Sequence, residues 1–444
     1  MAQTFYPITP VEVTPGTASA WTDVDVSAYV PAGATGVILH CVNTHASNNY
    51  ALGLRKNGST DARTTSITSN AHCWAAIGVD ANRIFEAYIG NTTYIDIYLV
   101  GYTVSGVTFF TNAYDKSKTT LTTWEDIDCS TEAPSAIGLI FEVKGSTAAY
   151  AMGLRTNGST DNRTASTLYH DTFGVIIGCD ASQICEGYIE NVAVDFFLVG
   201  YITDGCTFNT NATDVSLATT ATWLDLTALP ATANMGFIEV TSGGAYNYGL
   251  RKNGSAEDIY KYAFRHPWAF VECDASQIIE GEIANVAVDF FVVGYATAVA
   301  VVQLSAVSAG VCSVSGAIRV ARALAAASAG IASVSGAIRV ARSLSAISQG
   351  VASVTASLTK TKWLSAISAG VATVSGSIRV ARALSAVSAG IASVAGSLGI
   401  LRGLSATIAG SSIVTASLFH VRKGIKTLAA VRNLLAVRNI PPVR

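Results

Sequence analysis

Carboxylate pairs spaced six residues apart are the first residues in this chain whose types and spacing could do chemistry. The pair recurs three times, as Asp80 with Glu86, Asp180 with Glu186, and Asp274 with Glu280. Glycosidases use two carboxylates that flank the scissile bond. The Asp side chains could instead accept hydrogen bonds from turn amides in the sequences DANR and DASQ. A catalytic pair repeated three times in one chain would be unusual, so we interpret these residues as structural and predict no enzyme.

The motif Gly-Leu-Arg-x-Asn-Gly-Ser supplies the second set of candidates. Its Arg and Asn residues are Arg55 and Asn57, Arg155 and Asn157, and Arg251 and Asn253. Asn-Gly is the strongest short signal for a tight hairpin, because both residues tolerate positive φ. An Arg beside that hairpin could bind an acidic or sugar ligand, or it could pair across strands with Asp96, Asp195 or Asp289. The six residues are therefore candidate ligand-binding residues, with an internal ion pair as the alternative.

Metal and cofactor motifs are absent from the sequence. The six histidines are scattered without HxH or HExxH spacing, and the eight cysteines form no CxxC pair. Cys179 and Cys273 occupy the repeat position where the first copy has Val79, so we interpret them as small core hydrophobes. No GxSxG or Walker pattern occurs. The sequence predicts neither a metal nor a cofactor.

Three copies of a unit of about 100 residues must position these candidates. Besides the motifs above, the copies share the anchors Trp21-x-Asp23, Trp124-x-Asp126 and Trp223-x-Asp225. Short runs of β-branched and aromatic residues between turn residues are typical of antiparallel strands. We predict an all-β fold of three tandem β-sandwich, jelly-roll-like domains over residues 1–105, 106–204 and 205–300.

A second repeat, with a period of 20 residues, begins at Leu304. Six copies of a pattern like LSAxSAGxASVSGAIRVARA fill residues 301–423, and a basic tail with a six-residue rhythm occupies residues 424–444. An even period keeps each side chain on one face of a strand from copy to copy. Glycine costs about 1 kcal/mol in a helix interior. We therefore favour a repetitive β array over stacked Ala-rich helices. Its small apolar side chains must stack, which favours a homo-oligomer, most plausibly a homotrimer.

Charge is divided between the two kinds of repeat. Of the 28 Lys and Arg residues, 15 lie in residues 301–444, which contain no Asp or Glu, whereas all 30 acidic residues lie in residues 1–300. The net charge of −2 is therefore the sum of a basic array and an acidic remainder. The array could dock on an acidic protein surface, its charges could simply face solvent, or it could bind nucleic acid. Nucleic acid is the least favoured, because the array holds almost no aromatic residues for stacking.

The candidate attachment surface consists of the arginines that recur in the array. They are Arg319, Arg322, Arg339, Arg342, Arg379 and Arg382.

Targeting and membrane segments are not expected. The N-terminal residues MAQTFYPITPVEV lack the basic and apolar regions of a secretory signal. The longest weakly polar run, Phe290 to Val302, is well short of the roughly 20 residues that span a bilayer. We interpret this run as a buried strand followed by a linker.

The 20-residue array resembles the low-complexity Leu-Ser-Gly/Ala repeats of structural proteins in tailed bacteriophages, and residues 21–37 look like the opening of small β-sandwich modules in such proteins. The resemblance implies a virion component: a fibre, spike, collar or capsid decoration protein, assembled in the host cytoplasm. Its partners would be further copies of itself, virion proteins with acidic surfaces and host surface glycans. The alternative is a cell-surface adhesin or carbohydrate-binding protein with tandem lectin-like sandwiches.

Overall fold

Alternation of buried and half-buried residues explains why the first 300 residues form strands. In β8 (Ile95–Thr103) every second side chain is buried, as expected for a strand with one face in a core. The computed structural model describes residues 3–145, 148–166, 171–262 and 266–298, and the backbone of the strands between 304 and 434. The chain divides into two compact units, Met1–Val299 and Ala300–Arg444.

Each of the three repeats in the first unit supplies eight strands. The first repeat contains β1 (Phe5–Glu12), β2 (Trp21–Asp25), β3 (Gly36–Asn43), β4 (Tyr50–Lys56), β5 (Thr65–Ile67), β6 (His72–Gly78), β7 (Ile84–Ile89) and β8. The second contains β9 (Val107–Asp115), β10 (Glu125–Asp128), β11 (Gly138–Lys144), β12 (Ala151–Thr156), β13 (Ala165–Ser166), β14 (Thr172–Gly178), β15 (Ile184–Ile189) and β16 (Asp195–Ile202). The third contains β17 (Cys206–Asp214), β18 (Leu224–Leu226), β19 (Ala233–Ser242), β20 (Asn247–Lys252), β21 (Lys261–Tyr262), β22 (Trp268–Glu272), β23 (Ile279–Ile283) and β24 (Val288–Thr297).

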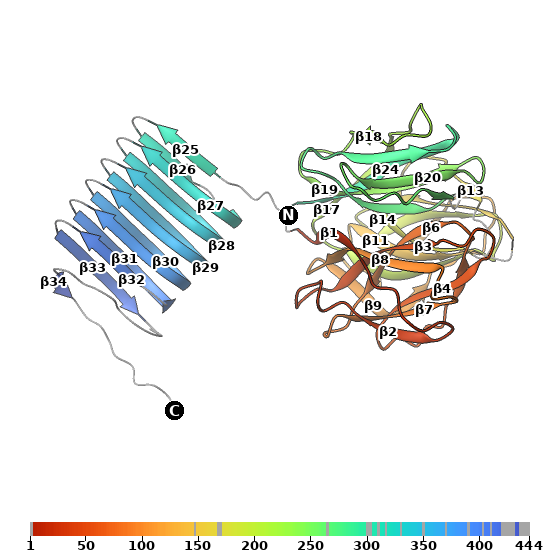
Figure 1. Ribbon diagram of the computed structural model, residues 1–444, viewed down its shortest axis with the longest axis horizontal. Coiled ribbons are helices and arrows are strands. Elements are labelled where there is room, and N and C mark those ends of the chain that lie inside the picture. The colour runs from red at the N-terminus through yellow and green to blue at the C-terminus, as the bar shows by residue number, and fades with distance from the viewer. Residues whose placement is uncertain are drawn as a thin grey trace. The chain divides into compact units, whose positions relative to one another are not determined.

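The 24 strands form six antiparallel four-stranded sheets, two from each repeat (Figure 1). In the first repeat the strand orders are β1-β8-β3-β6 and β2-β7-β4-β5, and the other two repeats have the same two orders. Two four-stranded sheets connected in this manner have the strand order of a jelly roll. All regular elements in the described residues are strands, which confirms the prediction of an all-β chain.

One sheet of each repeat is buried on both faces, because the three repeats pack around a common centre. Strand β3 is buried along its whole length, as is β14, and β6 exposes little. Strands β6, β14 and β22 come from different repeats and contact one another. The three repeats therefore share one hydrophobic core and form a closed ring with approximate threefold symmetry.

The N-terminal strand closes this ring between the third and first repeats. The ring of Phe5 packs edge-on against Phe237 of the third repeat, with 5.4 Å between ring centroids. The side-chain amide of Asn234 donates to the carbonyl oxygen of Phe5 over 2.8 Å. Repeats that the sequence presents in tandem are thus joined head to tail, and we call the three contacts between them junctions 1–2, 2–3 and 3–1.

The array forms one parallel sheet of ten strands. They are β25 (Leu304–Ser308), β26 (Val311–Ser315), β27 (Ile318–Ser328), β28 (Ile331–Ser348), β29 (Val351–Ser368), β30 (Val371–Ser388), β31 (Ile391–Leu401), β32 (Leu404–Ile408), β33 (Ser411–Leu418) and β34 (Val431–Leu434). In the described ladders from β25 to β33, paired residues lie 20 positions apart, as Leu344 and Leu364 do. Since paired residues lie 20 positions apart, each copy forms one turn of a coil and lies beside the equivalent residues of the preceding copy, as in a β-solenoid.

The described residues of this part of the chain form strands, as the even period predicts, and none of them is helical. The side chains of the six arginines in the candidate attachment surface lie outside the described residues, as does most of the basic tail.

Glycines at junction 1–2 give a direct test of the ring. A Cβ at Gly36 would lie 2.2 Å from the ring of Phe109, which belongs to the second repeat. We expect Gly36→Ala to lower the free energy of unfolding by about 1–3 kcal/mol through overpacking. Gly16→Ala is the matched control, because a Cβ there has no neighbour within 4 Å. Urea unfolding of both variants checks the prediction, and equal stabilities would contradict the packing at this junction.

Candidate functional site at the junctions between repeats

The arginine of the Arg-x-Asn-Gly motif is held inside its own repeat. Arg55 donates from Nε and Nη2 to the two carboxylate oxygens of Glu86, at 2.9 Å each, and its guanidinium lies 4.1 Å from the centroid of the Trp21 ring. The other copies repeat this arrangement: Arg155 pairs with Glu186 over Trp124, and Arg251 pairs with Glu280 over Trp223.

The carboxylates suggested above as cross-strand partners, Asp96, Asp195 and Asp289, are not those that pair with these arginines. Asp96 lies on β8, which belongs to the other sheet of the repeat. Arg55 and Glu86 face each other directly on the neighbouring strands β4 and β7. Whether the six Arg and Asn residues bind a ligand stays a prediction, but the arginines have little side-chain exposure from which to do so.

The Asn of the motif ties the hairpin to the turn that carries the repeated Asp. Asn57 donates to Asp80 Oδ2 over 2.9 Å, while Asp80 Oδ1 accepts from the amides of Asn82 and Ile84. The same bonds recur at Asp180 and Asp274. The bond from the Ile278 amide lowers the pKa of Asp274. The interpretation of these aspartates as turn-forming residues is confirmed.

A second set of charged residues, which the sequence analysis did not single out, joins one repeat to the next. At junction 1–2, Arg63 donates from Nε to Glu142 over 2.8 Å, and its guanidinium lies 4.5 Å from the Phe197 ring centroid. At junction 2–3, Arg163 binds Glu239 and lies over Phe291 in the same manner. Glu142 is largely buried, with 15% of its side chain exposed, and burial raises its pKa while the positive charge of Arg63 opposes that shift. Removing one member of such a buried pair typically costs about 3–5 kcal/mol.

Junction 3–1 lacks both members of this ion pair. Glycines at equivalent positions of β4, β12 and β20 identify the residues that correspond: a Cβ there would approach the carbonyl oxygens of Arg63, Arg163 and Ile259, respectively. Ile259 thus stands where the first two repeats have arginine. The strand position of Glu142 and Glu239 is occupied by His40 in the first repeat. Charge is therefore lost from both sides of the junction together.

A pair of buried histidines replaces the ion pair. His40 Nε2 and His72 Nδ1 lie 2.9 Å apart, and His40 stacks on Trp74 with 4.0 Å between ring centroids. Burial lowers the pKa of His40 to about 3. Burial, followed by the neighbouring His40, holds the pKa of His72 well below its usual value. Both rings are therefore neutral in the folded chain at neutral pH.

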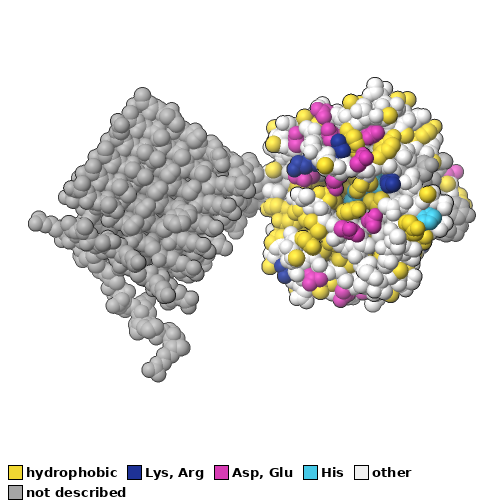
Figure 2. Space-filling view, viewed as in Figure 1, with side chains coloured by type: hydrophobic (Ala, Val, Ile, Leu, Met, Phe, Trp, Pro, Cys, Tyr) yellow, Lys and Arg dark blue, Asp and Glu magenta, His cyan; other side chains and the backbone are white. Residues whose placement is uncertain are grey.

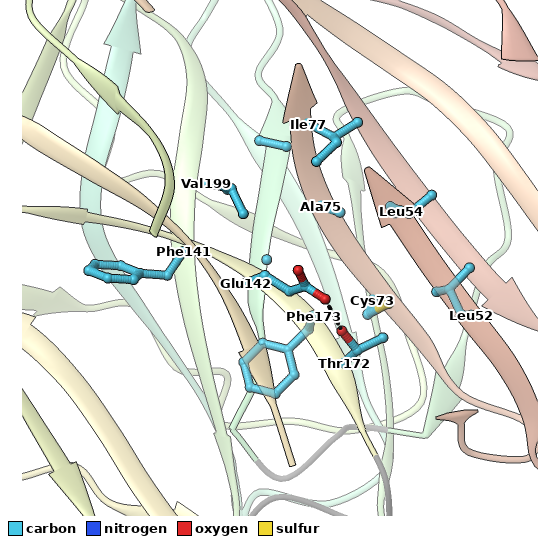
Figure 3. Close-up of a pocket in the computed structure, with 12 residues that line it drawn as sticks. Leu52, Leu54, Cys73, Ala75, Ile77, Phe141, Glu142, Thr172, Phe173 and Val199 are labelled. Atoms are coloured by element: carbon cyan, nitrogen blue, oxygen red, sulfur yellow. Dashed lines mark hydrogen bonds between the residues drawn. The ribbon is translucent and has the colours of Figure 1, made fainter. Parts of the chain in front are cut away.

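The first strand of each following repeat fills junctions 1–2 and 2–3. Asn112 Oδ1 accepts from Ser59 Oγ over 2.9 Å and from the amide of Thr60 over 2.8 Å, while the Ala113 amide donates to Asp61. At junction 2–3 the corresponding bonds are made by Asn211 and Ala212. A separate cavity of about 30 Å³ lies at junction 1–2 beside the Glu142–Thr172 hydrogen bond (Figure 3).

Junction 3–1 contains a cavity of about 290 Å³. Its walls come from β1, from β22 and from the loop that follows β20, and His40 and Trp74 also line it. Of the six predicted ligand-binding residues, Arg251 and Asn253 line this cavity. It is the candidate functional site, because it combines polar and apolar residues in a space that the equivalent junction 1–2 fills.

Other chemistry has less support in the described part of the chain. No group of three or more His, Cys, Asp or Glu side chains among the described residues could hold a metal ion. Described cysteines are free, and the thiols of Cys179 and Cys273 donate to backbone carbonyls over 3.3 Å. Burial raises the pKa of each of these two thiols to about 12. Among the described residues there is no helix long and apolar enough to cross a membrane.

One sequence motif could have indicated which residues join the repeats. Ser-Thr-Asp-x-Arg occurs at residues 59–63 and 159–163, and the third copy departs from it as Ser-Ala-Glu-x-Ile at residues 255–259. That departure coincides with the loss of Glu in the aligned strand of the first repeat.

Comparisons with known proteins give weak structural neighbours only. No family model and no curated protein matches the chain. The tandem CBM22 domain of Paenibacillus barcinonensis Xyn10C is 9% identical, with 46% of this chain and 99% of that chain covered and a TM-score of 0.14. A triple jelly-roll protein from the turret of an archaeal virus is 10% identical, with 65% and 91% covered and a TM-score of 0.19. A chain from the lipid-containing bacteriophage PM2 is 7% identical, with 65% and 86% covered and a TM-score of 0.12. With TM-scores this low, none of the three establishes a function.

The paired loss of charge at junction 3–1 predicts a strong coupling between two positions. His40→Glu alone places in a buried site a carboxylate that can pair with His72, as Glu239 does with His266, but that lacks the arginine of the other junctions, and it should lower the free energy of unfolding by about 3 kcal/mol. Adding Ile259→Arg recreates the ion pair of the other junctions and should restore much of that loss. A double-mutant cycle measured by urea unfolding should give a coupling free energy of about 2 kcal/mol. Additive changes in the free energy of unfolding would show that the side chains at positions 40 and 259 do not contact each other.

The buried histidines also predict a loss of stability in acid. Below pH 6.5 the unfolded chain binds protons on both imidazoles, whereas the folded chain holds His40 neutral down to about pH 3. The stability contributed by the neutral pair is therefore complete above pH 6.5 and falls as the pH drops below that value, by about 1 kcal/mol per pH unit for each histidine that stays neutral in the folded chain. The variant His40→Gln/His72→Thr should show a shallower slope in urea unfolding between pH 6.5 and 4.5. An unchanged slope would contradict the assignment.

Proposed function

We propose that the chain is a non-enzymatic structural component of a phage virion: a fibre, spike, collar or capsid decoration protein. The observation that carries the proposal is the closed ring, in which one chain unites three repeats with jelly-roll strand order around an approximate threefold axis. In this proposal each pair of sheets is one β-sandwich, and the three sandwiches form the projecting part. A ring whose recurring interior contacts are structural needs no catalytic chemistry to serve this role.

The basic array supplies oligomerisation and attachment in this proposal. Its strands pair with other strands of the same chain, so a homotrimer would associate through the faces or ends of solenoids and not through shared ladders. Figure 2 shows acidic side chains distributed over the visible face of the first unit. All acidic residues lie before residue 301, so the array has no internal counter-charge and suits an acidic partner surface in the virion.

A cell-surface or carbohydrate-binding role is the second candidate. The open, partly polar cavity at junction 3–1 is the specific observation that favours it, because small-molecule sites are concave and combine apolar walls with a few polar groups. The two roles are compatible in a virion protein that contacts host glycans.

Deletion of residues 304–444 tests whether the ring folds by itself and whether the array is responsible for oligomerisation. We expect residues 1–303 to remain folded, because the ring has its own core, and to be monomeric by light scattering, whereas the full chain forms the larger assembly. Antibodies against the ring should label purified virions, and mass spectrometry of those particles should detect the chain. A truncated protein that stays trimeric would refute the role of the array. A chain found on uninfected cells and missing from virions would favour the adhesin.

A further inference from the structure

The cavity at junction 3–1 exists because the first strand of the ring differs from its two counterparts. Strand β9 has four residues between Phe109, which pairs with Gly200, and Tyr114, which pairs with Leu198. Strand β1 has three residues in the same span, between Pro7, which pairs with Gly101, and Val11, which pairs with Leu99. The shorter bulge carries no asparagine, and Thr9 and Pro10 line the cavity where Asn112 fills the equivalent space.

Polar groups that are satisfied at the other junctions consequently face this cavity. Ser255 corresponds to Ser59, and its Oγ accepts from the Glu257 amide over 3.1 Å as Ser59 Oγ does from the Asp61 amide. Where the Ser59 hydroxyl donates to Asn112 over 2.9 Å, however, the Ser255 hydroxyl donates over a long 3.4 Å to the Glu257 carboxylate. Glu257 corresponds to Asp61, but Ile259 provides no arginine to pair with it. Burial raises the pKa of Glu257. The cavity therefore presents a hydroxyl donor and a carboxylate acceptor two residues apart, in the geometry that elsewhere binds one carbonyl oxygen and one N–H.

We propose that this cavity binds the acetamido group of an N-acetylated sugar. The acetamido carbonyl takes the place of Asn112 Oδ1 and accepts from Ser255 Oγ, while a hydroxyl of the sugar takes the place of the Ala113 amide and donates to Glu257. The Lys252–Glu272 ion pair, 2.8 Å long, lies at the same cavity and offers a donor and an acceptor to ring hydroxyls. Ile8, Pro10 and Phe270 provide apolar surface for the methyl group and the sugar ring.

The size of the cavity favours a small ligand over a peptide strand. Its volume of about 290 Å³ is at the lower end of the range of roughly 300–1,000 Å³ for small-molecule sites. A peptide in the position of β9 would have to displace β1, which already pairs with β8 there. This site is independent of the virion assignment, because it rests on the comparison of three junctions within one chain.

Saturation-transfer NMR and calorimetric titration of the full chain with the methyl glycoside of N-acetylglucosamine test the proposal. We expect saturable binding with the acetamido methyl protons in close contact, and at least tenfold weaker binding of methyl glucoside, which lacks the amide. Ser255→Ala and Glu257→Gln should each weaken binding about tenfold or more. Ser59→Ala is the matched control: it removes the equivalent hydroxyl at a filled junction and should leave binding unchanged.

Three results would overturn the proposal. One is equal binding of the two glycosides, which would show that the amide is not recognised. Another is a Ser59→Ala variant that loses binding while Ser255→Ala retains it, which would place the site elsewhere. The third is binding of a capped Phe-Thr-Asn-Ala peptide in preference to the sugar, which would make the site a peptide site. Thr9→Asn supplies a carboxamide from within the chain and should block binding without unfolding the ring.

Discussion

Burial of a second sheet face is the constraint on which the first unit depends. Each repeat packs one sheet against the other, but the sheet that contains β3 and β6 is apolar on both sides. Its outer face must be covered, and the other two repeats cover it through β14 and β22. A single repeat would leave that apolar face in water, so the unit that folds is the ring and not the repeat.

Charged pairs then determine how the repeats meet. Apolar surfaces give affinity without fixing orientation, whereas the buried guanidinium of Arg63 requires Glu142 at one position and the ring of Phe197 beneath it. Hydrogen-bonded pairs of this kind tolerate no sliding, because displacement leaves a buried charge without its partner. The junctions therefore combine a nonspecific driving force with a specific register.

Sequence patterns predicted the features that depend on neighbours in the chain. The all-β class, the β-structured array and the turn role of Asp80 follow from alternation, period and local hydrogen bonding, and the structure agrees. The partner of Arg55 could not be read from the pattern, because Glu86 and Asp96 are distinguished only by which strands lie side by side. Arg63 was overlooked for a similar reason: its partner Glu142 is 79 residues away and becomes adjacent only when the ring closes. The candidate cavity is present because junction 3–1 lacks the asparagine that fills the equivalent space at the other two junctions. This difference is seen only when the three junctions are superposed.

The chain crosses junctions 1–2 and 2–3 covalently, but junction 3–1 joins the two ends of the ring without a peptide link. An interface of this kind could be satisfied by another molecule, and repeat-by-repeat exchange between copies would then produce an open polymer in place of a closed ring. In such a polymer Ile259 of one copy would still meet His40 of the next, so this uncharged pair does not select against it. The pair does exclude the two end repeats from the other junctions, since either residue placed there would leave an arginine or a glutamate unpaired in the interior. Junction 3–1, which no peptide bond crosses, therefore differs in its contact residues from the other two junctions. The ring has a defined first and last repeat although its fold is nearly threefold symmetric.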